Sequence, residues 1–235
     1  MIFSASANSR LWEFLLSGGV FMAFIVICSL VAIAVSIHRF ISLRWDSIIP
    51  SFLRTELVRC DQYFIQRKTS ALYGALKGSD TPIGHIGRVA LSSDFKTREE
   101  ATEAVEATAH EEMVKMERGM GILEVIITIA PLLGLLGTVS GLVSVFGVLG
   151  DSTSADVDPK LLATGIAEAL TTTIAGLVVA VVTVILHSYF TRRLESVGAR
   201  LEVRTSHLMH QFYKHGGPLL YREEQQQPQP EQPQA

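Results

Sequence analysis

Three long stretches of the chain contain no Asp, Glu, Lys or Arg and consist mainly of apolar residues. They cover residues 14–37, 125–150 and 169–191, and are 24, 26 and 23 residues long. A helix needs roughly 20 such residues to cross a bilayer, and a buried helix of a soluble protein is usually shorter. The pattern therefore predicts transmembrane helices at 14–41, 125–150 and 161–191, with one acid, Glu168, inside the third.

Helix signals continue outside these stretches. A turn at residues 78–82 ends a helix-permissive segment, and Thr97 and Glu100 then form a capping box. The next proline is Pro131, so we expect a helix that starts at Thr97 and runs unbroken into the second span. Over residues 97–149 it would be ~80 Å long.

The third span has its own start and stop signals. Asp158 and Pro159 are a typical N-cap and first helical residue. The helix should continue to about Tyr213, because two glycines and a proline follow at residues 216–218. With a connection of about ten residues, the second and third long helices are expected to form a tall antiparallel hairpin.

Composition agrees with a membrane protein. Hydrophobic residues make up 48% of the 235-residue chain and charged residues 18%, against about 25% charged in soluble domains. The mean hydropathy is +0.33. The net charge is only −3 and no basic stripe appears, which argues against nucleic-acid binding. The first apolar stretch exceeds the core of a signal peptide and lacks its cleavage site, so we interpret it as an uncleaved anchor.

Basic residues near the span ends set the expected orientation. They cluster on one side, at Arg39, Arg44, Lys115, Arg118, Arg192, Arg193 and Arg200, whereas the other side has Arg10 and Lys160. The predicted layout is an external N-terminus (1–13), a cytoplasmic helical domain (42–124), an external loop (151–160), a cytoplasmic C-terminal helix (192–217) and a disordered Gln/Pro tail (218–235). Cys28 in a span and Cys60 in the cytosol would form no disulfide.

The two expected cytoplasmic helices have opposite charge. Residues 97–118 carry seven acids and three bases, and residues 192–214 carry five bases and two acids. Two interpretations stay open: the helices pair through these charges, or both are solvated faces whose surface pairs contribute little.

The second span is rich in glycine. Gly137 and Gly141 form a GxxxG motif, and Gly134 precedes it by one turn. Small residues let helices approach closely in lipid, so these positions are predicted to serve helix packing.

Glu168 is the main candidate functional residue. A carboxylate inside the bilayer costs roughly 2.5–3.5 kcal/mol on insertion scales, and such residues commonly mark an ion or proton path; alternatively, Glu168 lies at the interface and stays hydrated. Five span hydroxyls could face it, at Thr138, Ser140, Thr171, Thr172 and Thr173, or could bond back to their own helices. A helical wheel puts Thr172 on the Glu168 face and Thr173 about 140° away.

Catalytic and metal-binding motifs are incomplete. His110 and Glu111 begin like a zinc-protease motif, but Val114 stands where its second histidine belongs. His207 and His210 have helical spacing without a third ligand nearby. We therefore predict neither an enzyme, nor a cofactor, nor a metal site.

Two segments resemble a known family. Residues 130–141, APLLGLLGTVSG, resemble the A-P-x-x-G-L-x-G-T-V-x-G signature of the MotA/TolQ/ExbB proton-channel proteins. Residues 165–170, GIAEAL, followed by Thr173, Gly176 and Leu177, are similar to their third-span motif. The resemblance is specific over 125–190, and three spans place it nearest the ExbB and TolQ branch, because flagellar stator subunits have four.

The resemblance implies an all-α subunit of a homo-oligomeric, pentameric bundle in the bacterial inner membrane. An ExbD- or TolR-like single-span dimer would occupy the pore, and proton flow would drive a TonB- or TolA-like protein. The resemblance implies that Glu168, Thr138 and Thr173 form the proton path, and the helical wheel adds Thr172. It also implies that Pro131 and Gly176 serve helix packing together with Gly134, Gly137 and Gly141. The leading hypothesis is an ExbB-like energiser of TonB-dependent outer-membrane transport. The alternatives are a TolQ-like envelope-integrity motor or a non-conducting scaffold, which has no use for Glu168.

Overall fold

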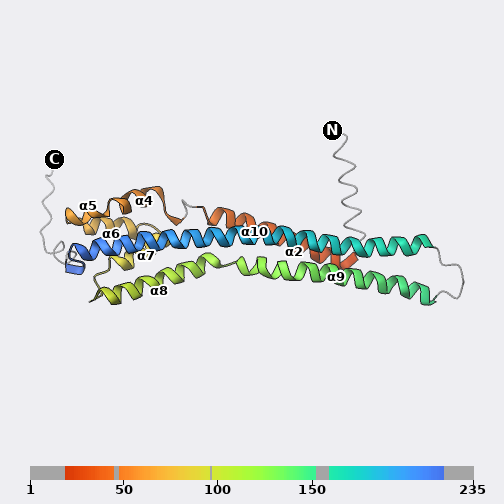
Figure 1. The fold of residues 1–235 in the computed structure, drawn as a ribbon. Helices are drawn as coiled ribbons and strands as arrows, with labels where there is room; N and C mark the ends of the chain where they lie inside the picture. The colour runs from red at the N-terminus through yellow and green to blue at the C-terminus, as the bar shows by residue number, and fades with distance from the viewer. Residues whose placement is uncertain (1–18, 45–47, 96, 152–158, 220–235) are drawn as a thin grey trace, which may run out of the picture. The chain divides into compact units, whose positions relative to one another are not determined.

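The computed structural model describes residues 19–44, 48–95, 97–151 and 159–219, and within these ranges all regular structure is helical (Figure 1). The helices are α2 (Gly19–Ser42), α4 (Ser51–Val58), α5 (Cys60–Ile65), α6 (Thr69–Lys77), α7 (Pro82–Ala90), α8 (Arg98–Glu117), α9 (Met120–Asp151) and α10 (Pro159–Lys214). The predicted all-α class is confirmed.

Three of the described helices are long and apolar enough to cross a membrane. The candidate spans lie at Gly19–Ser42, Met120–Gly147 and Leu162–Lys214, which confirms the predicted number. α10 begins at Pro159 and ends one residue after the expected Tyr213, where Gly216 and Gly217 both have positive φ. The expected external N-terminus, Asp158 with most of the external loop, and the tail from residue 220 lie outside the described residues.

The expectation of one unbroken helix from Thr97 into the second span is wrong. α8 ends at Glu117, Arg118 adopts an extended conformation (φ −52°, ψ 130°), and α9 starts at Met120. Between them Gly119 has φ +88°, a left-handed conformation that costs a residue with a side chain. A Cβ on Gly119 would also lie 3.3 Å from the Nη2 atom of Arg39, whose side chain is buried. Glycine therefore ends the helix without any proline.

The chain divides into two compact units. The first unit comprises the described parts of Met1–Arg39 and Gly119–Phe190, and the second those of Phe40–Arg118 and Thr191–Ala235. α10 contributes to both units. In the first unit α2 packs on α9 and α10 through small and apolar residues, among them Ala32, Ile126, Ala130 and Ala180.

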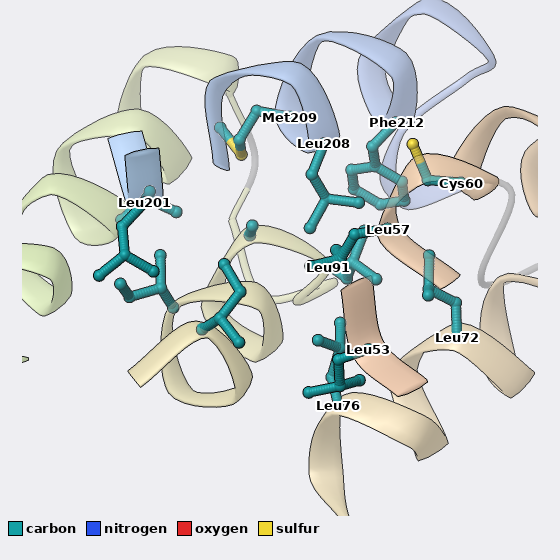
Figure 2. Close-up of a cluster of buried hydrophobic side chains, with 14 of the residues drawn as sticks. Leu53, Leu57, Cys60, Leu72, Leu76, Leu91, Leu201, Leu208, Met209 and Phe212 are labelled. Atoms are coloured by element: carbon teal, nitrogen blue, oxygen red, sulfur yellow. The ribbon is translucent and has the colours of Figure 1, made fainter. Parts of the chain in front are cut away.

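The second unit has its own apolar core, between the short helices α4–α7, α8 and the end of α10. Leucines of α4, α6 and α10 gather there with Leu91, which follows α7, and Phe212 of α10, as Figure 2 shows for Leu53, Leu57, Leu72, Leu76 and Leu91. Two predicted signals are confirmed at its edges. The residue 78–82 turn leads into α7, and the Thr97 hydroxyl caps α8 by accepting a hydrogen bond of 3.2 Å from the Glu100 amide.

Two acidic residues of α8 form ion pairs with Lys115 of the same helix, and one of them also contacts His85 of α7. Lys115 Nζ lies 2.9 Å from carboxylate oxygens of both Glu111 and Glu112. His85 of α7 contacts Glu112 through Nδ1 at 2.9 Å and Asp80 through Nε2 at 2.8 Å. Burial alone would raise the pKa of the Glu112 carboxyl, but hydrogen bonds with His85 and Lys115 hold it below its ordinary value. Charge pairing between α8 and α10 stays a prediction.

Candidate functional site

The membrane-spanning parts of α9 and α10 pack antiparallel through their glycines. A Cβ on Gly134 would lie 2.9 Å from the Thr172 carbonyl oxygen, and one on Gly141 would lie 2.8 Å from the Ala169 Cβ. A Cβ on Gly137 would clash with the Thr172 side chain, and one on Gly176 with the Ala130 carbonyl. All four glycines thus lie where the backbone or a small side chain of the other helix leaves no room for a Cβ.

Pro131 lies inside α9, three residues before Gly134. Proline cannot donate the usual helical hydrogen bond, here to the carbonyl of Ile127. In lipid such gaps are tolerated where neighbouring helices and hydroxyl side chains satisfy the backbone. Threonine hydroxyls bond to the backbone of the next turn of α9, at the Gly134 carbonyl.

Three of the candidate hydroxyls converge on one carbonyl. The Gly134 oxygen accepts hydrogen bonds from Thr138 (3.1 Å), Thr172 (3.3 Å) and Thr173 (2.9 Å). The Ala169 oxygen accepts from Thr138 (3.3 Å) and Thr172 (2.7 Å). The Thr138 and Thr173 hydroxyls also hydrogen-bond to each other across the two helices. Thr138, Thr172 and Thr173 therefore form one cluster.

The Thr138–Thr173 pair has two hydrogen-bonding arrangements. Each hydroxyl carries a single hydrogen and accepts through its lone pairs. When Thr173 donates to the Gly134 carbonyl, Thr138 can donate to Thr173. When Thr138 donates to a carbonyl instead, Thr173 can donate to Thr138. Such a pair can take up a hydrogen at one oxygen and release one at the other, which is what a proton relay requires.

The expected arrangement of five hydroxyls around Glu168 is wrong for the isolated subunit. Glu168 is exposed, whereas Thr172 is buried against α9 with 2% of its surface accessible. Thr171 bonds back to the Ala167 carbonyl at 2.8 Å, and Ser140 is exposed. Among the described residues, no hydrogen bond or ion pair joins Glu168 to the threonine cluster. The helical wheel placed Thr172 with Glu168 because a wheel describes one helix alone. In the structure, α9 packs on α10 and covers Thr172 but not Glu168.

Sequence reasoning missed the backbone groups of this site. The carbonyls of Gly134 and Ala169 accept from the cluster, and Ala169 itself is buried at 3% exposure against Gly141. The sequence offered one signal for this contact: Ala169 is a small residue directly after the span carboxylate Glu168, as expected where another helix packs closely. Within the described ranges, no group of three His, Cys, Asp or Glu side chains could hold a metal ion.

Comparisons with known proteins relate the chain to one family. The family model described as MotA/TolQ/ExbB proton channel family matches residues 78–203. An ExbB-like biopolymer transport protein of Synechocystis is 35% identical over 212 residues, covering 83% of this chain and 78% of its own. An ExbB homologue of Methanothermobacter thermautotrophicus is 40% identical over 122 residues, 52% of this chain and 42% of that protein.

Salmonella typhimurium has a biopolymer transport protein ExbB that is 40% identical over 86 residues. This match covers 37% of the chain and 34% of the relative. Some relatives are thus matched over less than half their length, but the family match contains the whole threonine cluster and Glu168. The chain, a multi-pass membrane protein with three apolar helices, belongs to the MotA/TolQ/ExbB proton channel family.

Proposed function

We propose that this protein is the channel subunit of a proton-driven motor in the bacterial inner membrane. With an ExbD- or TolR-like single-span partner, it converts proton-motive force into mechanical work on the cell envelope. The observation that carries the proposal is the Thr138–Thr173 hydroxyl pair inside two apolar helices, close in sequence to the span acid Glu168. The names of the relatives favour the transport branch, in which a TonB-like protein receives the force.

The exposure of Glu168 supports an assembly. Glu168 is exposed within an apolar span, in which Ile166 and Leu170, on the other side of α10, are 42% and 51% exposed. A carboxylate in such a span is costly unless it faces a bundle interior or water. A ring of subunits with Glu168 toward its axis meets that requirement. A dimer of the single-span partner would occupy the axis of the ring.

The residues then have separate roles. Glu168 binds and releases the proton, and Thr138 and Thr173 relay it, while Thr172 and the glycines hold α9 against α10. One charge moving through 100 mV releases about 2.3 kcal/mol. Proton binding by Glu168 removes its charge, which lets the acid move past an apolar surface before it ionises again.

Substitution of Glu168 tests the proposal against the non-conducting scaffold. Glu168→Gln keeps the size and hydrogen-bonding capacity but cannot ionise, so we expect normal assembly and loss of force-dependent uptake to the level of a strain without the gene. Glu168→Asp should keep partial activity. Glu103→Gln, an exposed acid of α8, is the matched control and should behave as wild type.

Two measurements report the result: complementation at matched expression, and proton flux in proteoliposomes that contain the partner. A Glu168→Gln protein that supports uptake as well as wild type would favour the scaffold. A TolQ-like motor is distinguished by complementation of envelope integrity in place of uptake.

A further inference from the structure

The second unit contains a cavity that the proposed proton path does not use. It has a volume of about 730 Å³ and lies between α8 and α10, and Ile86 of α7 also lines it. We call it the α8–α10 groove. Its volume is within the range of 300–1,000 Å³ that is typical of ligand sites.

The walls of the groove are small and apolar. α8 contributes Val105, Ala109 and Met113, and α10 contributes Leu201 and Met209. Methionine side chains adapt their shape to an occupant, and they are common on surfaces that bind peptides. The walls are therefore suited to apolar side chains of another chain.

Three exposed carboxylates belong to the lining of the groove. Glu106 of α8 and Glu195 and Glu202 of α10 line the groove and are exposed to solvent. Arg98 and His110 also line it, which leaves an excess of negative charge. A cationic occupant is therefore favoured over an anionic one.

A buried hydroxyl also lacks a partner in the groove. Thr205 lines the cavity and is 5% exposed. Within the part of the chain that the structure describes, its Oγ1 atom has no hydrogen-bond partner. Buried polar groups are nearly always hydrogen-bonded, since an unmade bond costs free energy. An occupant with a polar backbone or side chain would satisfy this hydroxyl.

We propose that the α8–α10 groove binds the basic cytoplasmic tail of the single-span partner. This rests on the proposed function, which supplies such a partner. Cytoplasmic segments next to a span carry an excess of Lys and Arg, and these would meet the three glutamates while adjacent apolar residues enter the groove.

Site-specific photo-crosslinking in cells tests the proposal. The photoreactive residue p-benzoylphenylalanine replaces Ala109 or Ala199, which line the groove. It replaces Ala107, an exposed residue of α8 outside the groove, as the control. We expect the groove positions to capture a single-span membrane protein, linked through residues on the cytoplasmic side of its span. Capture of only a second copy of this chain, or of lipid, would overturn the proposal.

Charge reversal adds a second readout. Glu106→Lys with Glu202→Lys should lower the crosslink yield at Ala109 about fivefold, because attraction becomes repulsion at two exposed sites. Glu103→Lys on the same helix, outside the groove, should leave the yield unchanged. Yields are compared per amount of assembled protein, and an unaltered yield in the double variant contradicts the charge argument.

A third crosslinker position separates this inference from the proposed function. Thr164 is exposed one helical turn before Glu168, on the same face of α10. If the Thr164 position captures the single-span protein and neither groove position does, the groove proposal is wrong and the motor proposal stands. If the Thr164 position captures no single-span protein, the partner of the proposed function is itself missing.

Discussion

Threonine hydroxyls in the spans make two kinds of hydrogen bond. Among the described residues, Thr183 bonds to its own helix, at 2.7 Å from the Val179 carbonyl, as span hydroxyls often do. Thr173 instead bonds across to α9, to the Gly134 carbonyl and the Thr138 hydroxyl. The second kind couples two helices, so its loss should affect function while loss of the first kind should not.

The first prediction compares these two threonines. Thr173→Val removes the cross-helix hydroxyl, and we expect loss of proton-driven uptake with a stability decrease of about 1 kcal/mol, the usual scale of one hydrogen bond. Thr183→Val is the control on the same helix and should retain uptake. Complementation and the melting temperature in detergent measure the two effects. Equal activity of both variants would show that Thr173 relays nothing.

The second prediction concerns Glu112, a buried carboxylate of α8 at 5% exposure. Since its pKa is lower in the folded protein than its ordinary value of 4.5, it stabilises the fold above that pH. The stability is lost as the pH falls through the lower, folded-state pKa. Glu112→Gln should therefore be less stable than wild type at pH 7, with a smaller further loss between pH 5 and 3.

Glu111→Gln is the matched control, because Glu111 contacts the same Lys115 from a side chain that is 66% exposed. Exposed pairs contribute little, so this variant should follow the wild-type pH curve. Melting temperatures across the pH range give the comparison. A Glu112→Gln curve parallel to wild type would mean that the carboxylate is not the group that titrates.

At the scale of elements, caps were predictable and the break at Gly119 was not. Thr97, Pro159 and the glycines after α10 are local signals, and the structure uses each of them. A single glycine in a helical pattern is often tolerated, so the sequence alone did not show that Gly119 takes a left-handed conformation beside Arg39. The boundaries of α4–α7 depend likewise on the core of their unit.

The same limit applies to the candidate site. Sequence spacing identified Thr138, Thr172 and Thr173 individually, but the register between α9 and α10 decides which oxygen atoms meet. Gly134, Gly137 and Gly141 set that register, because each faces the backbone or a small side chain of α10. A wheel drawn for one helix contains no information about the other.

The third prediction tests the break between α8 and α9. Gly119→Ala places a side chain at φ +88° and 3.3 Å from Arg39 Nη2, and left-handed backbone costs roughly 1–2 kcal/mol. We expect a lower melting temperature. Gly121→Ala, in the first turn of α9 with no atom within 4 Å of the added Cβ, should be neutral or stabilising. Equal melting temperatures for both variants would mean that the helix runs straight through Gly119.

At the scale of the whole molecule, the orientation of the chain rests on its basic residues. The native thiol of the segment predicted to be cytoplasmic is a poor probe of it. Cys60 has no exposed surface, and its Sγ lies 3.7 Å from His207 Nδ1. Burial, followed by the charge of Asp61, raises the pKa of the Cys60 thiol to about 11. A reagent that needs the thiolate will therefore react slowly with Cys60 from either side of the membrane.

An introduced thiol gives a sharper test. Ala107 is exposed on α8, and in a Cys28→Ala background an impermeant maleimide should label Ala107→Cys only after the membrane of spheroplasts is opened. Ser154→Cys, in the loop predicted to be external, should be labelled in intact spheroplasts. The basic residues Lys115 and Arg118 lie between Ala107 and the second span, so the positive-inside rule places Ala107 in the cytoplasm. Labelling of Ala107→Cys before opening would reverse the orientation, and it would place the α8–α10 groove on the side of the membrane where a partner's tail is not expected to be basic.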